Sequence, residues 1–218
     1  MLIQAVEVIG RGERLRVDVG GDAPVELAAS VCPTLTPGDH IDEATLLALR
    51  EATEDYDARE AALRLLSYRP RSHGELRERL ARKGVARERI ARCLDALEAA
   101  GVLDDGAFAE AHVREAVRLR PRGSRRLLAE LRRKGVAEET ATRAVERVLV
   151  EEESTDGELA LRAADGWTRR AGDRDLEHLC GRGERAAVER VRRRFWGYMS
   201  RRGFGPDAVR GALERICE

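Results

Sequence analysis

The chain has 218 residues, of which 43% are hydrophobic, 4% aromatic and 37% charged. The hydrophobic content is enough for a folded core and excludes a disordered chain, while the scarcity of aromatic side chains favours closely spaced helices over a β-sandwich. The formal net charge is zero, but residues 1–58 are acidic and residues 59–149 are basic. An acidic head beside a basic middle indicates an anionic partner, a contact between the two parts, or only a solvated surface.

No apolar run approaches the length of a bilayer span, and residues 1–8 lack the basic and apolar regions of a signal peptide. We therefore expect a cytoplasmic protein with no membrane partner. The cysteines are Cys32, Cys93, Cys180 and Cys217. They lie far apart without a C-x-x-C motif, so the sequence indicates neither a disulfide framework nor a zinc site.

The first 27 residues alternate between apolar and polar side chains. This period of two predicts two or three short antiparallel strands, with turns at residues 10–12 and 20–22. Asp42 is a good N-cap for a helix that runs through Leu49 and can continue to Tyr68. Pro70 should end that helix, because the residue before a proline is disfavoured in the helical conformation.

Three later stretches each place two basic residues before a glycine: Arg82-Lys83-Gly84, Arg133-Lys134-Gly135 and Arg201-Arg202-Gly203. The same apolar positions surround each glycine. Eight before, four before and one after it stand Leu76, Leu80 and Val85, then Leu127, Leu131 and Val136, then Phe195, Met199 and Phe204. The steps of three and four residues predict a helix, a left-handed glycine cap and a second helix in each stretch. The chain is therefore a repeat protein.

The predicted fold is mainly α, an elongated array of tandem three-helix repeats with a small N-terminal extension that contains β-strands. We place the extension and its linking helix at residues 1–55, and the repeats at 56–102, 103–152 and 153–218. The third repeat is longer than the others, because glycines interrupt the helical pattern between residues 151 and 190. Trp167 and Trp196 fall in this repeat, where we expect them to pack in its core.

Capping residues mark further helix starts. Ser72 with Glu75 forms a capping box, Asp104 or Asp105 can begin the next helix, and Ser124 restarts the cycle after a break at residues 121–123. A winged helix-turn-helix over residues 75–101 is an alternative, but it requires a strand pair after Gly101. The helix expected from residue 105 onward argues against it.

The basic pairs have two interpretations. Cations at a helix C-terminus complement the helix dipole by about 0.3–1 kcal/mol, which would account for one pair. Three pairs at one repeat position, with more arginines in the same helices, favour a binding surface. The predicted binding residues are Arg77, Arg79, Arg82, Lys83, Arg125, Arg126, Arg132, Arg133, Lys134, Arg201 and Arg202. If the first two pairs only cap helices, the surface around Arg193 and Arg194 in the third repeat is the alternative.

Motifs of catalytic and nucleotide-binding sites are missing from the sequence. There is no phosphate loop, no G-x-S-x-G elbow and no H-E-x-x-H helix, and the histidines are scattered. Asp104 and Asp105 are better explained by helix capping than by acid–base chemistry. We therefore expect a protein that is not an enzyme and that uses no cofactor or metal.

Over residues 57–217 the chain resembles the bacterial regulatory protein RecX family. The resemblance rests on residues 72–76 with 82–84, residues 101–105 with 108–109, Gly123 with 130–135, and residues 201–204. It implies a protein that binds the RecA filament on single-stranded DNA and inhibits its ATPase and strand-exchange activities. We expect the protein itself to be a monomer. Such a protein would modulate homologous recombination, DNA repair and the SOS response without catalytic residues. The alternative is a helix-turn-helix-like protein that binds DNA directly through its basic middle.

Overall fold

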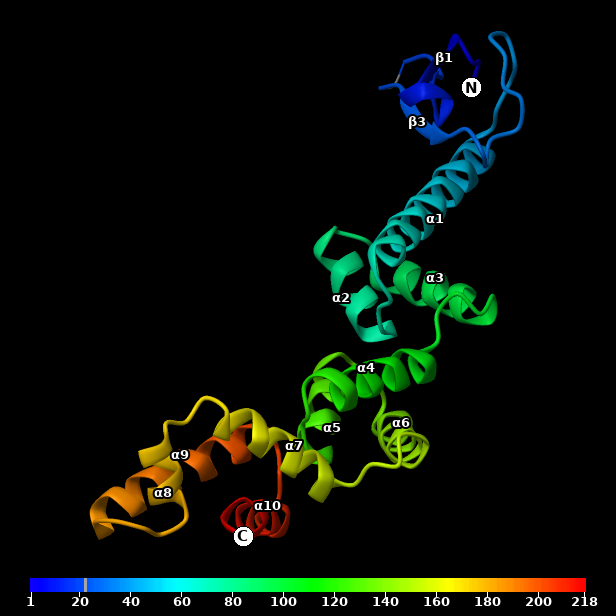
Figure 1. Ribbon diagram of the computed structural model, residues 1–218. Helices are drawn as coiled ribbons and strands as arrows, with labels where there is room; N and C mark the ends of the chain where they lie inside the picture. The colour runs from blue at the N-terminus through cyan, green and yellow to red at the C-terminus, as the bar shows by residue number, and fades with distance from the viewer. Residues whose placement is uncertain (22) are drawn as a thin grey trace. The chain divides into compact units, whose positions relative to one another are not determined.

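The computed structural model describes residues 1–21 and 23–218, with 65% of the chain in helices (Figure 1). The predicted class, mainly α with a small N-terminal sheet, is confirmed. The described chain divides into two compact units. Unit 1 holds residues 1–71 and 76–103, and unit 2 holds residues 72–75 and 104–218.

Unit 1 begins with an antiparallel sheet of three strands, β1 (Ala5–Ile9), β2 (Arg14–Asp18) and β3 (Val25–Ala28), in that order. The 3-10 turn η1 (Gly10–Gly12) joins β1 to β2 at the predicted position. Val17 pairs with Val6 on one side and with Val25 on the other, and it is fully buried. The predicted strands are thus confirmed. The second predicted turn includes Asp22, which lies outside the described residues.

Helix α1 (Glu43–Tyr68) links the sheet of unit 1 to its helices. Asp42 caps it by accepting a hydrogen bond from the backbone N–H of Thr45 at 2.6 Å, as predicted. The hydroxyl oxygen of Thr53 accepts a bond from the backbone N–H of Ala28 at 3.0 Å, which ties α1 to β3. The later turns of α1 pack with α2 (His73–Arg82) and α3 (Arg87–Ala99) around a second apolar cluster. Residue 55, our predicted domain boundary, falls inside this continuous helix.

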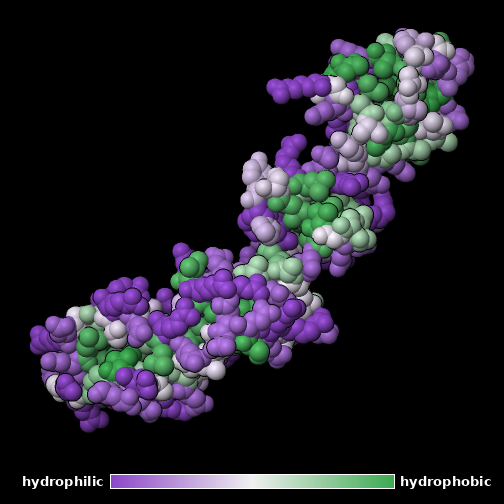
Figure 2. Space-filling view, turned by 45° about the vertical axis from the view of Figure 1, so that its right-hand side comes forward, coloured by the Kyte–Doolittle hydropathy of each residue, from purple (hydrophilic) through white to green (hydrophobic). Residues whose placement is uncertain are grey.

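Unit 2 is helical throughout its described residues. It contains α4 (Asp105–Leu119), α5 (Ser124–Arg133), α6 (Glu138–Glu151), α7 (Asp156–Thr168), α8 (Asp173–Leu179), α9 (Arg185–Arg201) and α10 (Pro206–Cys217). One apolar cluster runs through it from α4 to α10. In Figure 2 the surface of these helices is largely hydrophilic, with hydrophobic residues showing between them. The extra length of the third repeat is taken up by α8 and by α9, which has 17 residues against 10 in both α2 and α5.

The repeated apolar ladder is confirmed by burial. The positions eight and four before the glycine are 0% exposed in all three repeats. The three glycines have φ values of 83°, 78° and 84°, the left-handed conformation that ends a helix. A helix begins after Asp104, which accepts a bond from the backbone N–H of Ala107, so a wing does not follow Gly101. Trp167 packs edge-on against Phe195 in the core of unit 2, with ring centroids 5.3 Å apart.

The expectation that no cysteines pair is wrong. Cys180 and Cys217 form a disulfide, with their Cα atoms 5.2 Å apart. Cys180 follows α8 and Cys217 ends α10, so tertiary folding brings together two residues that stand 37 positions apart. Cys32 and Cys93 are half-buried free thiols, and burial raises the pKa of each. None of the described helices is long and apolar enough to cross a membrane.

Candidate functional site

The basic helix end of the third repeat lies against the start of α5. The backbone N–H of Gly123 donates to the carbonyl of Arg202 at 2.9 Å. A Cβ on Gly123 would lie 2.6 Å from the carbonyl oxygen of Gly203, and one on Gly203 would lie 2.6 Å from the backbone nitrogen of Arg126. The Arg201-Arg202-Gly203 end is therefore part of a close backbone joint within unit 2.

A similar joint surrounds the second basic helix end. The hydroxyl of Ser72 donates to the carbonyl of Lys134, and a Cβ on Gly74 would lie 2.6 Å from the Cα of Gly135. The ammonium of Lys134 bonds Glu75 at 3.0 Å and lies 5.6 Å from the ring centroid of Phe108. These contacts hold the Lys134 side chain within the protein. For this residue they favour a role in stabilising the helix end over a role in binding a partner.

Aspartates give the two joints a second common feature. The backbone N–H of His73 donates to the carboxylate of Asp105 at 2.7 Å, and that of Ser124 donates to Asp156 at 2.9 Å. Both aspartates are the first residues of their helices, α4 and α7. Each caps the start of an earlier helix, because backbone N–H groups at a helix start lack partners within the helix. Capping by Asp104 and Asp105 is therefore confirmed, although Asp105 caps α2.

The predicted binding residues do not form one cluster. On α2 and just after it, Arg77, Arg79, Arg82 and Lys83 are exposed, and Arg82 pairs with Glu78. Arg125, Arg132 and Arg133 are exposed on α5, where Arg132 pairs with Glu138 at 3.1 Å. The structure brings together only Arg126, Arg201 and Arg202 of the predicted set, in one cavity of unit 2.

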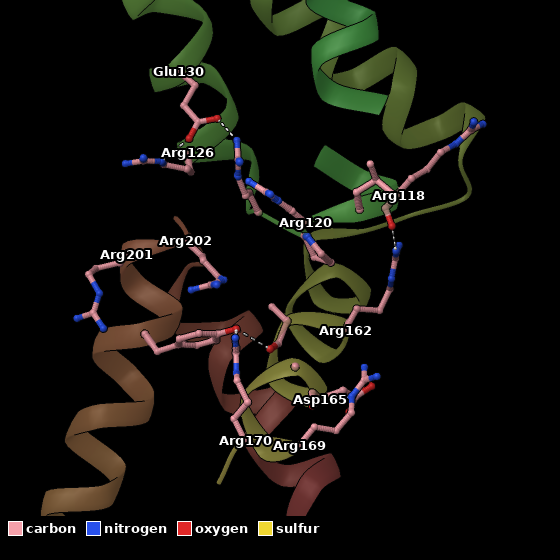
Figure 3. Close-up of a pocket in the computed structure, with 16 residues that line it drawn as sticks. Arg118, Arg120, Arg126, Glu130, Arg162, Asp165, Arg169, Arg170, Arg201 and Arg202 are labelled. Carbon is pink, nitrogen blue, oxygen red and sulfur yellow. Dashed lines mark hydrogen bonds and ion pairs between the residues drawn. The ribbon is translucent and has the colours of Figure 1, made fainter. Parts of the chain in front are cut away.

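That cavity has a volume of about 760 Å³, and we call it the arginine basin (Figure 3). It is lined by Arg118, Arg120, Arg122, Arg126, Arg162, Arg169, Arg170, Arg201 and Arg202, together with Leu119, Pro121, Glu130, Ala163, Asp165, Gly166 and Tyr198. The last turn of α4, the segment after it, α5, α7 and α9 all contribute. Guanidinium groups from distant parts of the sequence therefore face a shared space.

Glu130 organises one wall of the basin from a buried position. Its carboxylate accepts a bond from Arg126 at 2.6 Å, pairs with Arg122 and lies 3.3 Å from the ring nitrogen of His112. Burial by itself raises the pKa of Glu130, but the hydrogen bond from Arg126 and the charge of Arg122 outweigh it and hold that pKa below its ordinary value. Glu130 is therefore an anion that fixes two arginines while balancing only one charge.

A second wall of the basin is built around Tyr198. Arg170 donates to the Tyr198 hydroxyl at 2.9 Å, and the guanidinium of Arg202 lies 3.7 Å from the Tyr198 ring centroid. Burial is the main cause that lowers the pKa of Arg202, and the charges of Arg170, Arg122 and Arg201 lower it further. These like charges repel one another, so an anion bound among them would be favoured.

Sequence reasoning missed six of the nine arginines, namely Arg118, Arg120, Arg122, Arg162, Arg169 and Arg170. A local signal existed for the first three, because arginines alternate through residues 118–122 around Pro121. The other three lie in the irregular third repeat, where the apolar pattern of the sequence does not show which helix face each residue occupies. Guanidinium donors can hold a carboxylate or a phosphate with two parallel hydrogen bonds, so this lining is chemically suited to anions.

Comparisons with known proteins match the first two repeats to models of one family. Sequence models of the first and second RecX three-helix domains match residues 58–97 and 104–145. Regulatory protein RecX of Mycolicibacterium vanbaalenii is 37% identical over 67% of this chain and 75% of its own length. The RecX of Chromohalobacter salexigens is 34% identical over 77% of this chain and 97% of its own length.

Solved structures share the fold. A crystal structure of regulatory protein RecX aligns with a TM-score of 0.70 at 23% identity, over 98% of this chain and all of the other. RecX from Lactobacillus salivarius aligns with a TM-score of 0.57 at 20% identity, over 76% of this chain and 97% of the other. With relatives above 30% identity that are matched over most of their length, this chain belongs to the RecX family of regulatory proteins.

Proposed function

We propose that the protein binds the filament that the RecA recombinase forms on single-stranded DNA and inhibits its ATP hydrolysis and strand exchange. Membership of the RecX family carries this proposal, because the relatives are named regulatory proteins and the family resemblance implies RecA as the target. The protein would act by stoichiometric binding rather than catalysis, as a cytoplasmic regulator of recombination, DNA repair and the SOS response.

The repeated helices suit a polymeric target. Each repeat presents a basic helix end, and repeat proteins often use such series of equivalent surfaces to bind extended partners. Our proposed filament contacts are the exposed basic residues of α2 and of the segment just after it, together with Arg125, Arg132 and Arg133 of α5. Arg82 and Lys83 are the first choice, because Lys134 is held by Glu75. A filament repeats its own surface, so one bound chain can block neighbouring sites or stop growth.

The test is DNA-dependent ATP hydrolysis by RecA, measured while the chain is added from well below to equal molar amounts. We expect the rate to fall before the two proteins are equimolar, because one bound chain should affect several RecA subunits. The chain alone should hydrolyse no ATP. An unchanged RecA rate at equal concentrations, or hydrolysis by the purified chain, would count against the proposal.

A further inference from the structure

We propose that the arginine basin of unit 2 binds the phosphate backbone of single-stranded nucleic acid. The site goes beyond regulation of a partner protein and requires no RecA. It also differs from the exposed helix ends of α2 and α5, since its lining comes mainly from the segment after α4, from α7 and from α9. The protein would thus have a nucleic-acid site of its own.

The balance of charge in the basin is the first argument. Nine arginines line the cavity with only two carboxylates, Glu130 and Asp165. Glu130 is already engaged by Arg122 and Arg126, and Arg118 pairs with Glu152 outside the lining, at 2.7 Å. Among the described residues Arg120 and Arg201 have no ion pair. The surplus of positive charge therefore remains unbalanced within the protein.

The distribution of the charges indicates a chain of phosphates rather than one small anion. Figure 3 shows Arg201, the last residue of α9, and Arg202 just after it on one side of the space. Arg162, Arg169 and Arg170, on or just after α7, lie on another side. A single phosphate can satisfy two or three guanidinium groups, whereas nine spread around a cavity suit a ligand with repeated negative charges. A phosphodiester backbone has this property.

Several of the guanidinium groups are already held in place. Arg170 and Arg202 rest on Tyr198, whose hydroxyl donates to the carbonyl of Ala163 at 3.2 Å. Arg162 donates to the carbonyl of Arg118 at 3.0 Å. Side chains that are fixed before binding lose less conformational entropy when a ligand arrives. The basin is thus prepared for an anion before one binds.

The lining favours a nucleic-acid backbone over an acidic peptide or a duplex. Its apolar residues are few, namely Leu119, Pro121 and Ala163, so it offers little to the side chains of a peptide. Arg202 covers one face of the Tyr198 ring, so that face is closed to base stacking. A flexible strand can follow a concave site directly, whereas a stiff duplex must first be deformed, which costs energy. Binding should therefore depend on phosphates and little on base sequence.

The test uses the full chain and a fluorescent oligodeoxythymidine strand, without RecA, and measures anisotropy at several salt concentrations. The test variant is Arg120→Glu with Arg201→Glu, because neither side chain has an ion pair among the described residues. The matched control is Arg174→Glu with Arg190→Glu. Those residues are exposed on α8 and α9 outside the lining, and the change in net charge is the same. Thermal melts confirm that both variants fold.

For the wild type we expect log affinity to fall with log salt at about 0.7 per phosphate contacted, with two or more contacts. The basin variant should bind at least about tenfold more weakly. Its slope should be smaller by about 1.4, because it loses two phosphate contacts of about 0.7 each. The control should keep the wild-type slope. Equal losses in both variants, or no binding by the wild type, would overturn the site.

Competitors separate the possible ligands. An unlabelled strand should displace the probe, while poly-glutamate and duplex DNA at equal charge should displace it less effectively. Poly-glutamate as the better competitor would instead assign the basin to an acidic protein segment, and a better duplex would overturn the preference for a single strand. Because the assay contains no RecA, its failure leaves the proposed regulation of RecA standing, and the ATPase test can fail without affecting this one.

Discussion

At the scale of single residues, the buried carboxylate of Glu130 fixes the positions of neighbouring arginines. Its relative exposure is 7%, and it holds Arg122 and Arg126 in one wall of the basin. Without the carboxylate, the two arginines would lose their shared anion, although both of their side chains are partly exposed to water. Glu130 therefore serves the basin although it opposes the sign of the proposed ligand.

The substitution Glu130→Ala should lower the free energy of unfolding by about 1–3 kcal/mol, because Arg122 and Arg126 lose their shared charged hydrogen-bond partner while their side chains keep partial contact with water. Urea denaturation followed by circular dichroism measures the effect. The control is Glu139→Ala, at a side chain that is 84% exposed and whose loss should change little. A similar midpoint for Glu130→Ala and wild type would show that water or neighbouring groups compensate for the carboxylate.

Stability should depend on pH through the same residue. The pKa of Glu130 is lower in the folded protein than in the unfolded chain, because Arg126 and Arg122 favour the carboxylate. Its contribution is therefore complete above the unfolded pKa and is lost as pH falls through the folded pKa. The difference in stability between wild type and Glu130→Gln should shrink on acidification from pH 7. A constant difference down to pH 3 would rule out this linkage.

At the scale of elements, the glycine that ends each repeat's basic helix has a different environment in unit 1 and unit 2. Gly84 and Gly203 have φ values of 83° and 84°, so any side chain strains both. Among the residues that the structure describes, none outside the chain neighbours of Gly84 has a heavy atom within 4 Å of a Cβ placed there. A Cβ on Gly203 would collide with the backbone of Arg126. Gly84 and Gly203 therefore share a backbone conformation, but only Gly203 is also required by the close approach of another segment.

Substitution with alanine separates the two effects. Gly84→Ala should destabilise the protein by about 1–2 kcal/mol from left-handed strain alone. Gly203→Ala should cost about 1–3 kcal/mol more, because α5 must also move away from α9. Thermal and urea melts of the two variants make the comparison. Equal losses would mean that the close approach of Gly123 and Gly203 relaxes without cost.

The disulfide between α8 and α10 is another property of elements. Because the bond closes a loop of 37 residues, chain entropy predicts a contribution of about 4 kcal/mol. Reduction with dithiothreitol, or Cys180→Ser, should lower the denaturation midpoint of the oxidised protein, whereas Cys32→Ser should not change its response to reductant. Titration of thiols under denaturing, non-reducing conditions should find two. Four titratable thiols would show that the bond does not form.

At the scale of the whole molecule, the proposed functions fall on different surfaces. The favoured filament contacts, Arg82 and Lys83, belong to unit 1, and the arginine basin belongs to unit 2. Arg82→Glu with Lys83→Glu should weaken binding to the RecA filament at least about tenfold without changing affinity for bare DNA, since charge reversal removes contacts only where they are made. Filament co-sedimentation and anisotropy measure the two. Equal effects on both would indicate one shared surface.

Local patterns in the sequence were sufficient for most of the fold. The apolar positions around Gly84, Gly135 and Gly203 predicted the helices, because steps of three and four residues place side chains on one helix face. Asp42 and Asp104 predicted helix starts, because a cap depends on groups within three residues. The family resemblance followed from the same motifs.

Only the tertiary structure decided the contacts between segments far apart in the chain. Asp105 and Asp156 cap helices that begin 32 residues earlier, and Cys180 meets Cys217 because α8 and α10 end together. The arginine basin likewise depends on how α7 and α9 pack beside the segment after α4. Periodicity fixes which face of a helix is buried but not which helix covers it, so the sequence alone could predict basic residues and could not predict the cavity they share.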